Sequence, residues 1–89
     1  MSLTERELAQ AAAYLELIAE YHKLGQVSLA EELEEQLLDL RGWTREPCGL
    51  YRDSSGDGGT ATRSRALRIV VREVHRARQA IVGAMSRAA

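Results

Sequence analysis

The residues best suited to chemistry are arginines near the C-terminal end of the chain. Residues 60–89 contain seven arginines and one acid, and three of these arginines recur at every fourth position. On a helix this spacing puts the guanidinium groups on one face, where they can follow the phosphates of a nucleic acid. The segment lacks aromatic residues for stacking, which favours a duplex backbone over a single strand. The candidate nucleic-acid-binding residues are Arg63, Arg65, Arg68, Arg72 and Arg76.

A second interpretation of the arginines follows from the acidity of the other end of the chain. Residues 1–41 hold nine acids against three bases, a net charge of −6, whereas residues 60–89 carry +6. A basic helix packed on an acidic partner segment would offset both charges within one molecule. We favour this neutralised arrangement and keep the exposed basic face as the alternative.

Acidic and aromatic residues in the middle of the chain form a second candidate surface. A row of carboxylates can meet a basic partner, including a nucleic-acid-binding protein by charge mimicry. Buried aromatic anchors often dominate the energetics of protein interfaces. The candidate partner-binding residues are Glu31, Glu32, Glu35, Asp39, Trp43 and Tyr51.

Signals for catalysis or for a metal site are weak. Cys48, His22 and His75 are the soft ligands of the chain, and their spacing matches no zinc or di-iron pattern. A run from Asp53 to Gly58 resembles the first half of a calcium loop, but Ser64 stands where a bidentate glutamate is required. We therefore expect no catalytic residues, no metal and no cofactor.

A glycine-rich stretch, residues 56–59, precedes the basic segment and ends in Thr60 and Thr62. A helix beginning there could offer its free N–H groups to a phosphate. The lysine step of a nucleotide-binding loop is missing, so the sequence favours a linker followed by a threonine cap.

Apolar periodicity predicts an all-α fold in a single domain, residues 1–89. The expected elements are an antiparallel helical hairpin and a long C-terminal third helix, in a bundle-like arrangement. Capping boxes mark two helix starts, Thr4 with Glu7 and Ser28 with Glu31. The predicted segments are a helix over about 4–24, a helix over about 28–41, a loop over 42–60 and a helix over about 61–87.

The predicted third helix has more apolar surface than a hairpin with one narrow seam can cover. A flanking second stripe contains Val71, Val82 and Met85. This excess predicts homodimerisation through the third helix, or a partner protein laid against it. In the preceding loop, Trp43 and Tyr51 are expected to pack on the end of the hairpin, while residues 53–60 are expected to be mobile.

The predicted hairpin resembles one tetratricopeptide-type helix pair. Leu17, Tyr21, Gly25 and Ala30 stand where that repeat places its large apolar, aromatic, turn-glycine and small packing residues. The likeness covers about a third of the chain in one copy, and stacked repeats need three or more units for stability. The sequence departs from the repeat at Ile18, Leu37 and Gly42. The resemblance implies protein binding and not catalysis, and we interpret the segment as a tight helical hairpin.

These observations together predict a small non-enzymatic adaptor, regulator or inhibitor that binds a partner protein, of the kind that bacteria and phages encode. Nucleic-acid binding through the arginine-rich helix is the alternative. A single cysteine excludes an intramolecular disulfide, and charged residues 5–7 precede any apolar run. We therefore expect a cytoplasmic protein.

Overall fold

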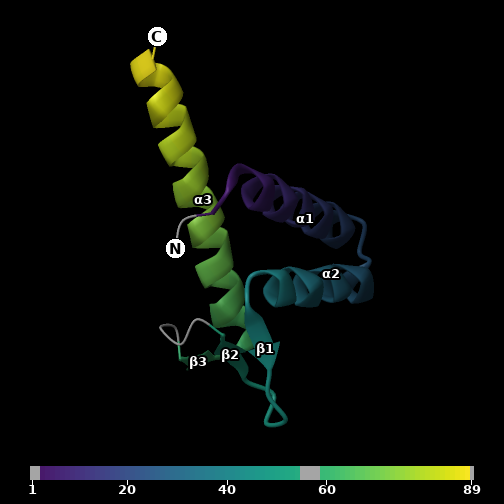
Figure 1. The fold of residues 1–89 in the computed structure, drawn as a ribbon. Coiled ribbons are helices and arrows are strands. Elements are labelled where there is room, and N and C mark those ends of the chain that lie inside the picture. Colours follow the sequence, from purple (N-terminus) through teal and green to yellow (C-terminus); the bar gives the residue numbers. More distant parts are fainter. Residues whose placement is uncertain (1–2, 55–58, 89) are drawn as a thin grey trace.

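A computed structural model describes residues 3–54 and 59–88. Figure 1 shows a hairpin of two helices whose open end abuts a long third helix, with short strands beside the first turns of that helix. The elements are α1 (Glu5–Lys23), α2 (Val27–Leu40), β1 (Trp43–Arg45), β2 (Tyr51–Asp53), β3 (Thr60–Ala61) and α3 (Arg63–Ala88). The fold is mostly helical, in agreement with the coarse prediction.

The prediction of a loop over 42–60 is wrong, because this segment forms a small antiparallel sheet of order β1-β2-β3. Tyr51 in the central strand pairs with Arg45 on one side and with Ala61 on the other. Each strand has only two or three residues, which is too short for the alternation of apolar and polar residues to be visible in a sequence. Residues 55–58, part of the segment predicted to be mobile, lie outside the described residues.

The start of α1 is the predicted capping box. The Oγ1 atom of Thr4 accepts a hydrogen bond from the Glu7 N–H at 3.1 Å, and Glu7 Oε1 accepts one from the Thr4 N–H at 3.1 Å. Two of the N–H groups that a helix start leaves unpaired are satisfied in this way. The first turn of α1 is therefore capped by side chains of the same segment.

The predicted cap at Ser28 is wrong. The second helix begins one residue earlier, with Gln26 at the N-cap position and no side-chain capping bond. The preceding turn explains the shift: Gly25 adopts a positive φ of 74°, and the Gln26 N–H donates to the carbonyl of Tyr21 at 2.9 Å. These backbone bonds close α1 and carry the chain directly into α2, so that Ser28 lies inside the first turn.

The start of α3 is also shifted from the prediction, from about residue 61 to Arg63. Thr62 precedes the helix, and its Oγ1 accepts a hydrogen bond from the Arg65 N–H at 3.3 Å. Ala61 belongs to β3 instead and is buried. The expected threonine cap is therefore present at Thr62.

The core lies where the hairpin, the sheet and the first half of α3 meet. Leu37 and Leu38 of α2 are fully buried, as is Val70 of α3, while Val74 retains 2% exposure. Small residues allow close approach, since Ala30 of α2 and Ala66 of α3 have no exposed surface. The rest of the core is Leu8, Ala11, Ile18, Trp43, Tyr51 and Ala61. The second half of α3 runs past the hairpin (Figure 1).

Arg41 ties the three helices together by charge. It follows the last residue of α2, and its Nη1 atom lies 3.1 Å from Glu7 Oε2 of α1. Its Nη2 atom lies 3.4 Å from Glu73 Oε2 of α3. The side chain is only 15% exposed, so its ion pairs are less screened than surface pairs. The open end of the hairpin is thereby fixed against α3.

Acid should weaken this end of the hairpin. The hydrogen bonds that Glu7 shares with Thr4 lower the pKa of the Glu7 carboxyl, and the nearby Arg41 lowers it further. A depressed folded-state pKa stabilises the protein above the unfolded-state pKa, and this contribution is lost as the pH falls through the folded-state pKa. We expect the melting temperature of Glu7→Gln to fall less between about pH 5 and pH 3 than that of the wild type. Circular dichroism melts would measure this.

The matched control is Glu16→Gln, a change of an exposed residue on the same helix. Its melting temperature should follow the wild-type dependence on pH. Identical curves for Glu7→Gln and the wild type would show that the carboxylate of Glu7 does not stabilise the fold.

Candidate functional site

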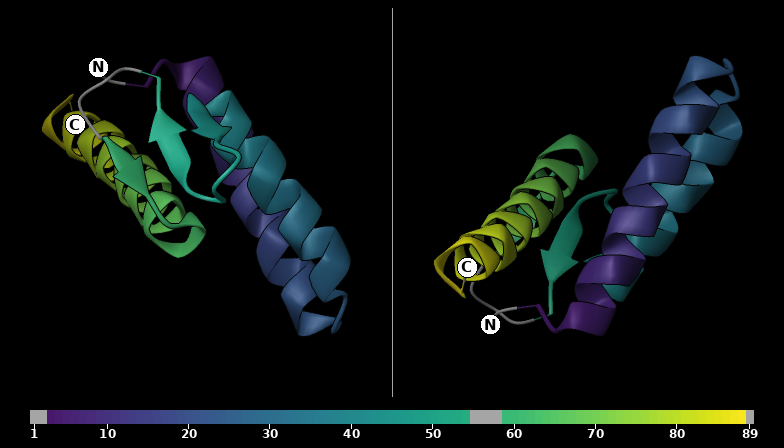
Figure 2. Two further views of the ribbon diagram at one scale, coloured as in Figure 1. Left: turned by 90° about the horizontal axis from the view of Figure 1, so that it is seen from below. Right: turned by 90° about the horizontal axis from the view of Figure 1, so that it is seen from above.

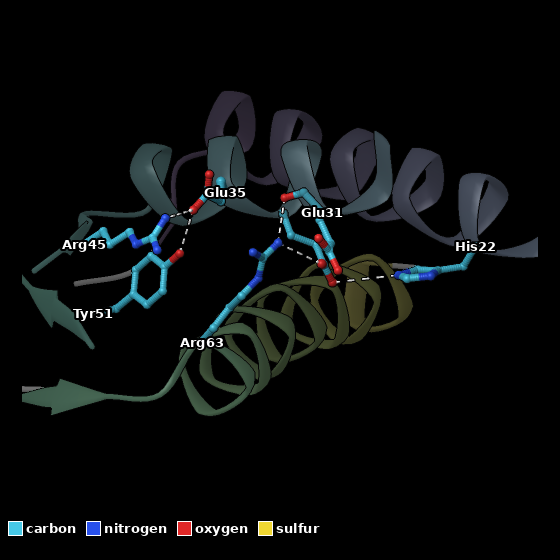
Figure 3. Close-up of polar contacts among 7 residues, drawn as sticks. His22, Glu31, Glu35, Arg45, Tyr51 and Arg63 are labelled. Carbon is cyan, nitrogen blue, oxygen red and sulfur yellow. Dashed lines mark hydrogen bonds and ion pairs between the residues drawn. The ribbon is translucent and has the colours of Figure 1, made fainter. Parts of the chain in front are cut away.

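The predicted acidic surface is divided between internal contacts and free carboxylates. Arg63 Nη2 donates to the backbone oxygen of Glu31 at 2.6 Å and to Glu34 Oε1 at 3.1 Å (Figure 3). His22 Nε2 lies 3.9 Å from the second carboxylate oxygen of Glu34. These contacts fix the first turn of α3 against α2. Arg63, predicted as a nucleic-acid contact, is therefore engaged inside the molecule.

Glu35 makes the corresponding link between α2 and the sheet. Its Oε1 atom accepts a hydrogen bond from the Tyr51 hydroxyl at 2.9 Å and another from Arg45 Nη1 at 3.4 Å (Figure 3). Glu31, Glu32 and Asp39 are exposed. Among the predicted acidic contacts, Glu31, Glu32 and Asp39 thus keep their side chains on the surface, whereas Glu35 positions β2.

The two predicted aromatic anchors are core residues. Trp43 is 3% exposed and Tyr51 is 4% exposed, and both belong to the buried cluster shared by the hairpin and α3. This agrees with the expectation that they pack on the hairpin. Their burial leaves neither ring available to a partner in this fold. Each begins a strand with a buried first position, and no pattern in such short strands reveals this orientation.

Tyr51 should report this burial in alkaline solution. Desolvation, and then the hydrogen bond to Glu35, raise the pKa of Tyr51. A raised folded-state pKa contributes stability that is complete below the unfolded-state value of about 10 and is lost as the pH rises through the folded-state pKa. We expect Tyr51→Phe to remove a tyrosinate absorbance component that titrates above about pH 10 and returns to the ordinary range in denaturant.

The control is Tyr21→Phe, a half-buried tyrosine of α1. This variant should retain the late component. If Tyr51→Phe left the absorbance titration of the folded protein unchanged except in amplitude, the ring of Tyr51 would not be shielded from solvent.

Among the described side chains, five arginines of α3 are exposed. Arg78 lies on a flank of the helix, whereas Arg65, Arg68, Arg72 and Arg76 share another side. At about 3.6 residues per turn these four lie on the side of the helix opposite the buried Val70 and Val74. Among the described residues, Arg63 is the arginine of α3 that forms an ion pair with the hairpin. The favoured neutralisation of the two charged ends within one molecule is therefore wrong for these four arginines, which form the exposed basic face that the sequence left as the alternative.

An apolar strip runs beside this basic face. Leu67 is half-buried, whereas Val71, Val82 and Met85 are 44%, 65% and 69% exposed. We call these four residues the α3 stripe. A shallow hollow of about 420 Å³ lies along its first part, beside Arg68 and Arg72, and another of about 550 Å³ adjoins Val82. The second stripe predicted for the helix is therefore exposed.

The hairpin also exposes large apolar side chains on both helices and at the turn between them. Leu17, Leu24, Leu29 and Leu40 are 42–62% exposed, and we call this set the hairpin outer face. The hydroxyl of Tyr14 donates to Gln36 Oε1 at 3.2 Å, which joins α1 and α2 on this side. The exposed acids Glu32 and Asp39 lie at its border on the α2 helical wheel.

The spacing of apolar residues in α2 predicts one narrow stripe that contains Leu40 and either Leu29 or Ala30, and this prediction leaves no exposed leucines on the helix. In the structure the seam is offset, and Leu37 and Leu38 are the buried leucines of that helix. The signal that was available is the width of the apolar pattern, since Leu37 and Leu38 are adjacent and cannot lie on one narrow stripe with Leu29.

A groove of about 440 Å³ lies between the N-terminal segment and the middle of α3. Its apolar lining includes Leu3, Leu8 and Ile81, with Glu73 and Arg76 at its edge. Ala77 and Ala80 complete the wall on α3. The small side chains of α3 at this point leave the space that the groove occupies.

The candidate catalytic and metal-binding residues are not brought together. Cys48 is exposed in the connection between β1 and β2, and His75 is exposed on α3. Within residues 3–54 and 59–88, no three His, Cys, Asp or Glu side chains gather as a metal site would require. Most of the calcium-like run, residues 55–58, lies outside the described residues.

Across the described part of the chain, no helix combines the length and the apolar character that crossing a bilayer requires. No family model matches the sequence, and neither a curated protein nor a solved structure is significantly similar to this chain.

Proposed function

We propose that the protein acts by stoichiometric binding of a partner protein through α3, as a small non-enzymatic adaptor, regulator or inhibitor. The observation that carries this proposal is the exposed α3 stripe on a helix that runs past the body of the fold. An apolar strip of this kind, bordered by charge, is typical of surfaces that receive an amphipathic helix.

The charge beside the α3 stripe defines the kind of partner. Arg68 and Arg72 lie along one border, and residues 60–89 carry a net charge of +6. An acidic partner surface gains from this arrangement both in association rate and in specificity, whereas a basic one is repelled. The expected partner therefore combines apolar side chains with carboxylates.

An affinity pull-down from lysate with nuclease, comparing the wild type with Val82→Asp, tests this function. We expect the wild type to retain a discrete partner after nuclease treatment and Val82→Asp to lose it, because a carboxylate there would face the apolar side chains and the carboxylates of the partner. Leu50→Asp, a change of an exposed residue at the β1–β2 connection, should retain the partner. Retention by Val82→Asp would exclude the α3 stripe.

Nucleic-acid binding is a second candidate, favoured by the exposure of the arginines opposite the core of α3. Changing Arg68, Arg72 and Arg76 together to glutamine should abolish salt-sensitive binding to duplex DNA or RNA, and each single change should reduce the magnitude of the salt slope by about 1. The control changes three exposed arginines elsewhere, Arg6, Arg45 and Arg52. Because Arg45 and Arg52 form ion pairs with Glu35 and Glu46, circular dichroism must verify that this variant is folded. Equal affinity of the two triple variants would exclude the arginine face of α3.

A further inference from the structure

The two ends of the chain keep their opposite charges on opposite surfaces. Residues 1–41 and 60–89 carry −6 and +6. Among the described residues, two ion pairs join α3 to the hairpin and its flanking residues, Arg63–Glu34 and Arg41–Glu73. The first pair takes its acid from residues 1–41 and its base from residues 60–89, and the second pair does the reverse, so the two pairs leave the net charge of each end unchanged. Both surfaces remain available to a partner of opposite sign.

Pairing of α3 with a second α3 fits these charges poorly. Arg78 lies between Val71 and Val82 on the same side of the helix, and Arg68 and Arg72 border the stripe. Side-by-side α3 helices would bring like charges together along most of the contact. The surface that covers the α3 stripe must instead supply acids.

The hairpin outer face has the required chemistry. It presents four exposed leucines, and the exposed carboxylates of Glu32 and Asp39 lie at its border. Apolar surface meets apolar surface, and acids meet the arginines beside the α3 stripe. The same chain therefore contains both halves of a complementary contact.

The two halves do not meet within one molecule. Val71, Val82 and Met85 of the α3 stripe are 44–69% exposed and the four leucines are 42–62% exposed, so other side chains form the contact between the hairpin and α3, which lie beside each other in Figure 2. A contact between two different surfaces of identical molecules is heterologous. It builds a closed ring when the rotation from one copy to the next divides a full turn, and an open chain when it does not.

We propose that the α3 stripe of one copy docks on the hairpin outer face of a second copy, in a head-to-tail contact. This inference rests on the proposed use of α3 as a binding surface and names the partner surface. A standard interface buries about 800 Å² on each partner. The described protein exposes 6535 Å², and α3, at about 1.5 Å per residue, is roughly 39 Å long. The exposed area is therefore large enough for two such interfaces, one on the α3 stripe and one on the hairpin outer face.

Charge reversal of each surface tests the contact by sedimentation velocity over a series of protein concentrations. One variant carries Arg68→Glu and Arg72→Glu, and the other carries Glu32→Arg and Asp39→Arg. All four residues are exposed, and circular dichroism verifies that both variants are folded. The wild type is expected to increase in mass with concentration. Raising the salt concentration should reverse this, because the screening length falls from about 10 Å at 0.1 M to about 3 Å at 1 M.

Each variant alone is expected to remain monomeric, and an equimolar mixture of the two is expected to associate. The mixture restores opposite charges across the contact, which no general loss of folding or solubility would reproduce. The matched control carries Glu5→Arg and Glu16→Arg on the other side of α1, and it should associate like the wild type.

A monomeric wild type at every concentration would overturn the inference. Association of the Glu32→Arg, Asp39→Arg variant alone would also overturn it and would indicate contact between α3 helices. So would a mixture that stays monomeric while the wild type associates. If the wild type is monomeric but its pull-down partner is lost in Val82→Asp, the proposed function stands and only the self-association fails.

Discussion

Replacing Leu37 with alanine is expected to lower the free energy of unfolding by about 2–5 kcal/mol, as for other fully buried leucines. Leu37 has no exposed surface and belongs to the one cluster in which the hairpin, the sheet and α3 meet. Truncation removes its transfer energy and leaves a cavity that the surrounding helices cannot close. Because an 89-residue domain is marginally stable, this loss is a large part of the total.

Chemical denaturation of Leu37→Ala beside Leu40→Ala measures this effect. Leu40 lies on the same helix but is 46% exposed, so its truncation should cost well under half as much. For a domain of this size, each 1 kcal/mol shifts the melting temperature by about 4–8 °C. Equal losses of unfolding free energy in the two variants would show that α2 does not bury the side that contains Leu37.

Replacing Gly42 with alanine is also expected to destabilise the fold. Gly42 has a φ of 86°, a conformation that costs a residue with a side chain roughly 1–2 kcal/mol. An added Cβ would also lie 2.7 Å from the Oγ atom of Ser54, so that side chain must move. The Ser54 N–H donates to the carbonyl of Gly42 at 2.7 Å, which joins the end of α2 to the strand β2. The strain therefore falls on the link between the hairpin and the sheet.

Gly83→Ala provides the contrast in a thermal melt. Gly83 lies in α3, its φ is not positive, and an added Cβ would meet nothing within 4 Å. Alanine there should stabilise the helix by about 0.5–1 kcal/mol. Gly42→Ala should lower the melting temperature, whereas Gly83→Ala should raise it. A melting temperature for Gly42→Ala at or above the wild-type value would mean that the positive φ is not required.

Local signals in the sequence are strong where the structure is set by neighbouring residues. The capping box of Thr4 and Glu7, the turn at Gly25 and the three helices all follow from spacing and residue type, and the structure contains each of them. Ser28 shows the limit of such reasoning. Its sequence fits a cap, but backbone bonds in the turn before it begin the helix one residue earlier.

Features that depend on tertiary packing were not predictable in the same way. The strands beginning at Trp43 and Tyr51 form because their first residues are buried under the hairpin and α3, and their two- or three-residue lengths leave no pattern. The exposure of the charged side chains was equally hard to predict. The sequence showed that the ends of the chain have opposite signs, but only the placement of α3 shows that Arg68 and Arg72 face solvent.

The position of Arg41 between the three helices affects how the protein unfolds. Its guanidinium group is held by a carboxylate from α1 and another from α3, although it belongs to the end of α2. If any one helix moves away, a largely buried cation loses a partner, and the cost falls on the two helices that remain. The junction of the three helices should therefore unfold as one cooperative unit, so that backbone amides near Glu7, Arg41 and Glu73 share a common free energy of hydrogen exchange.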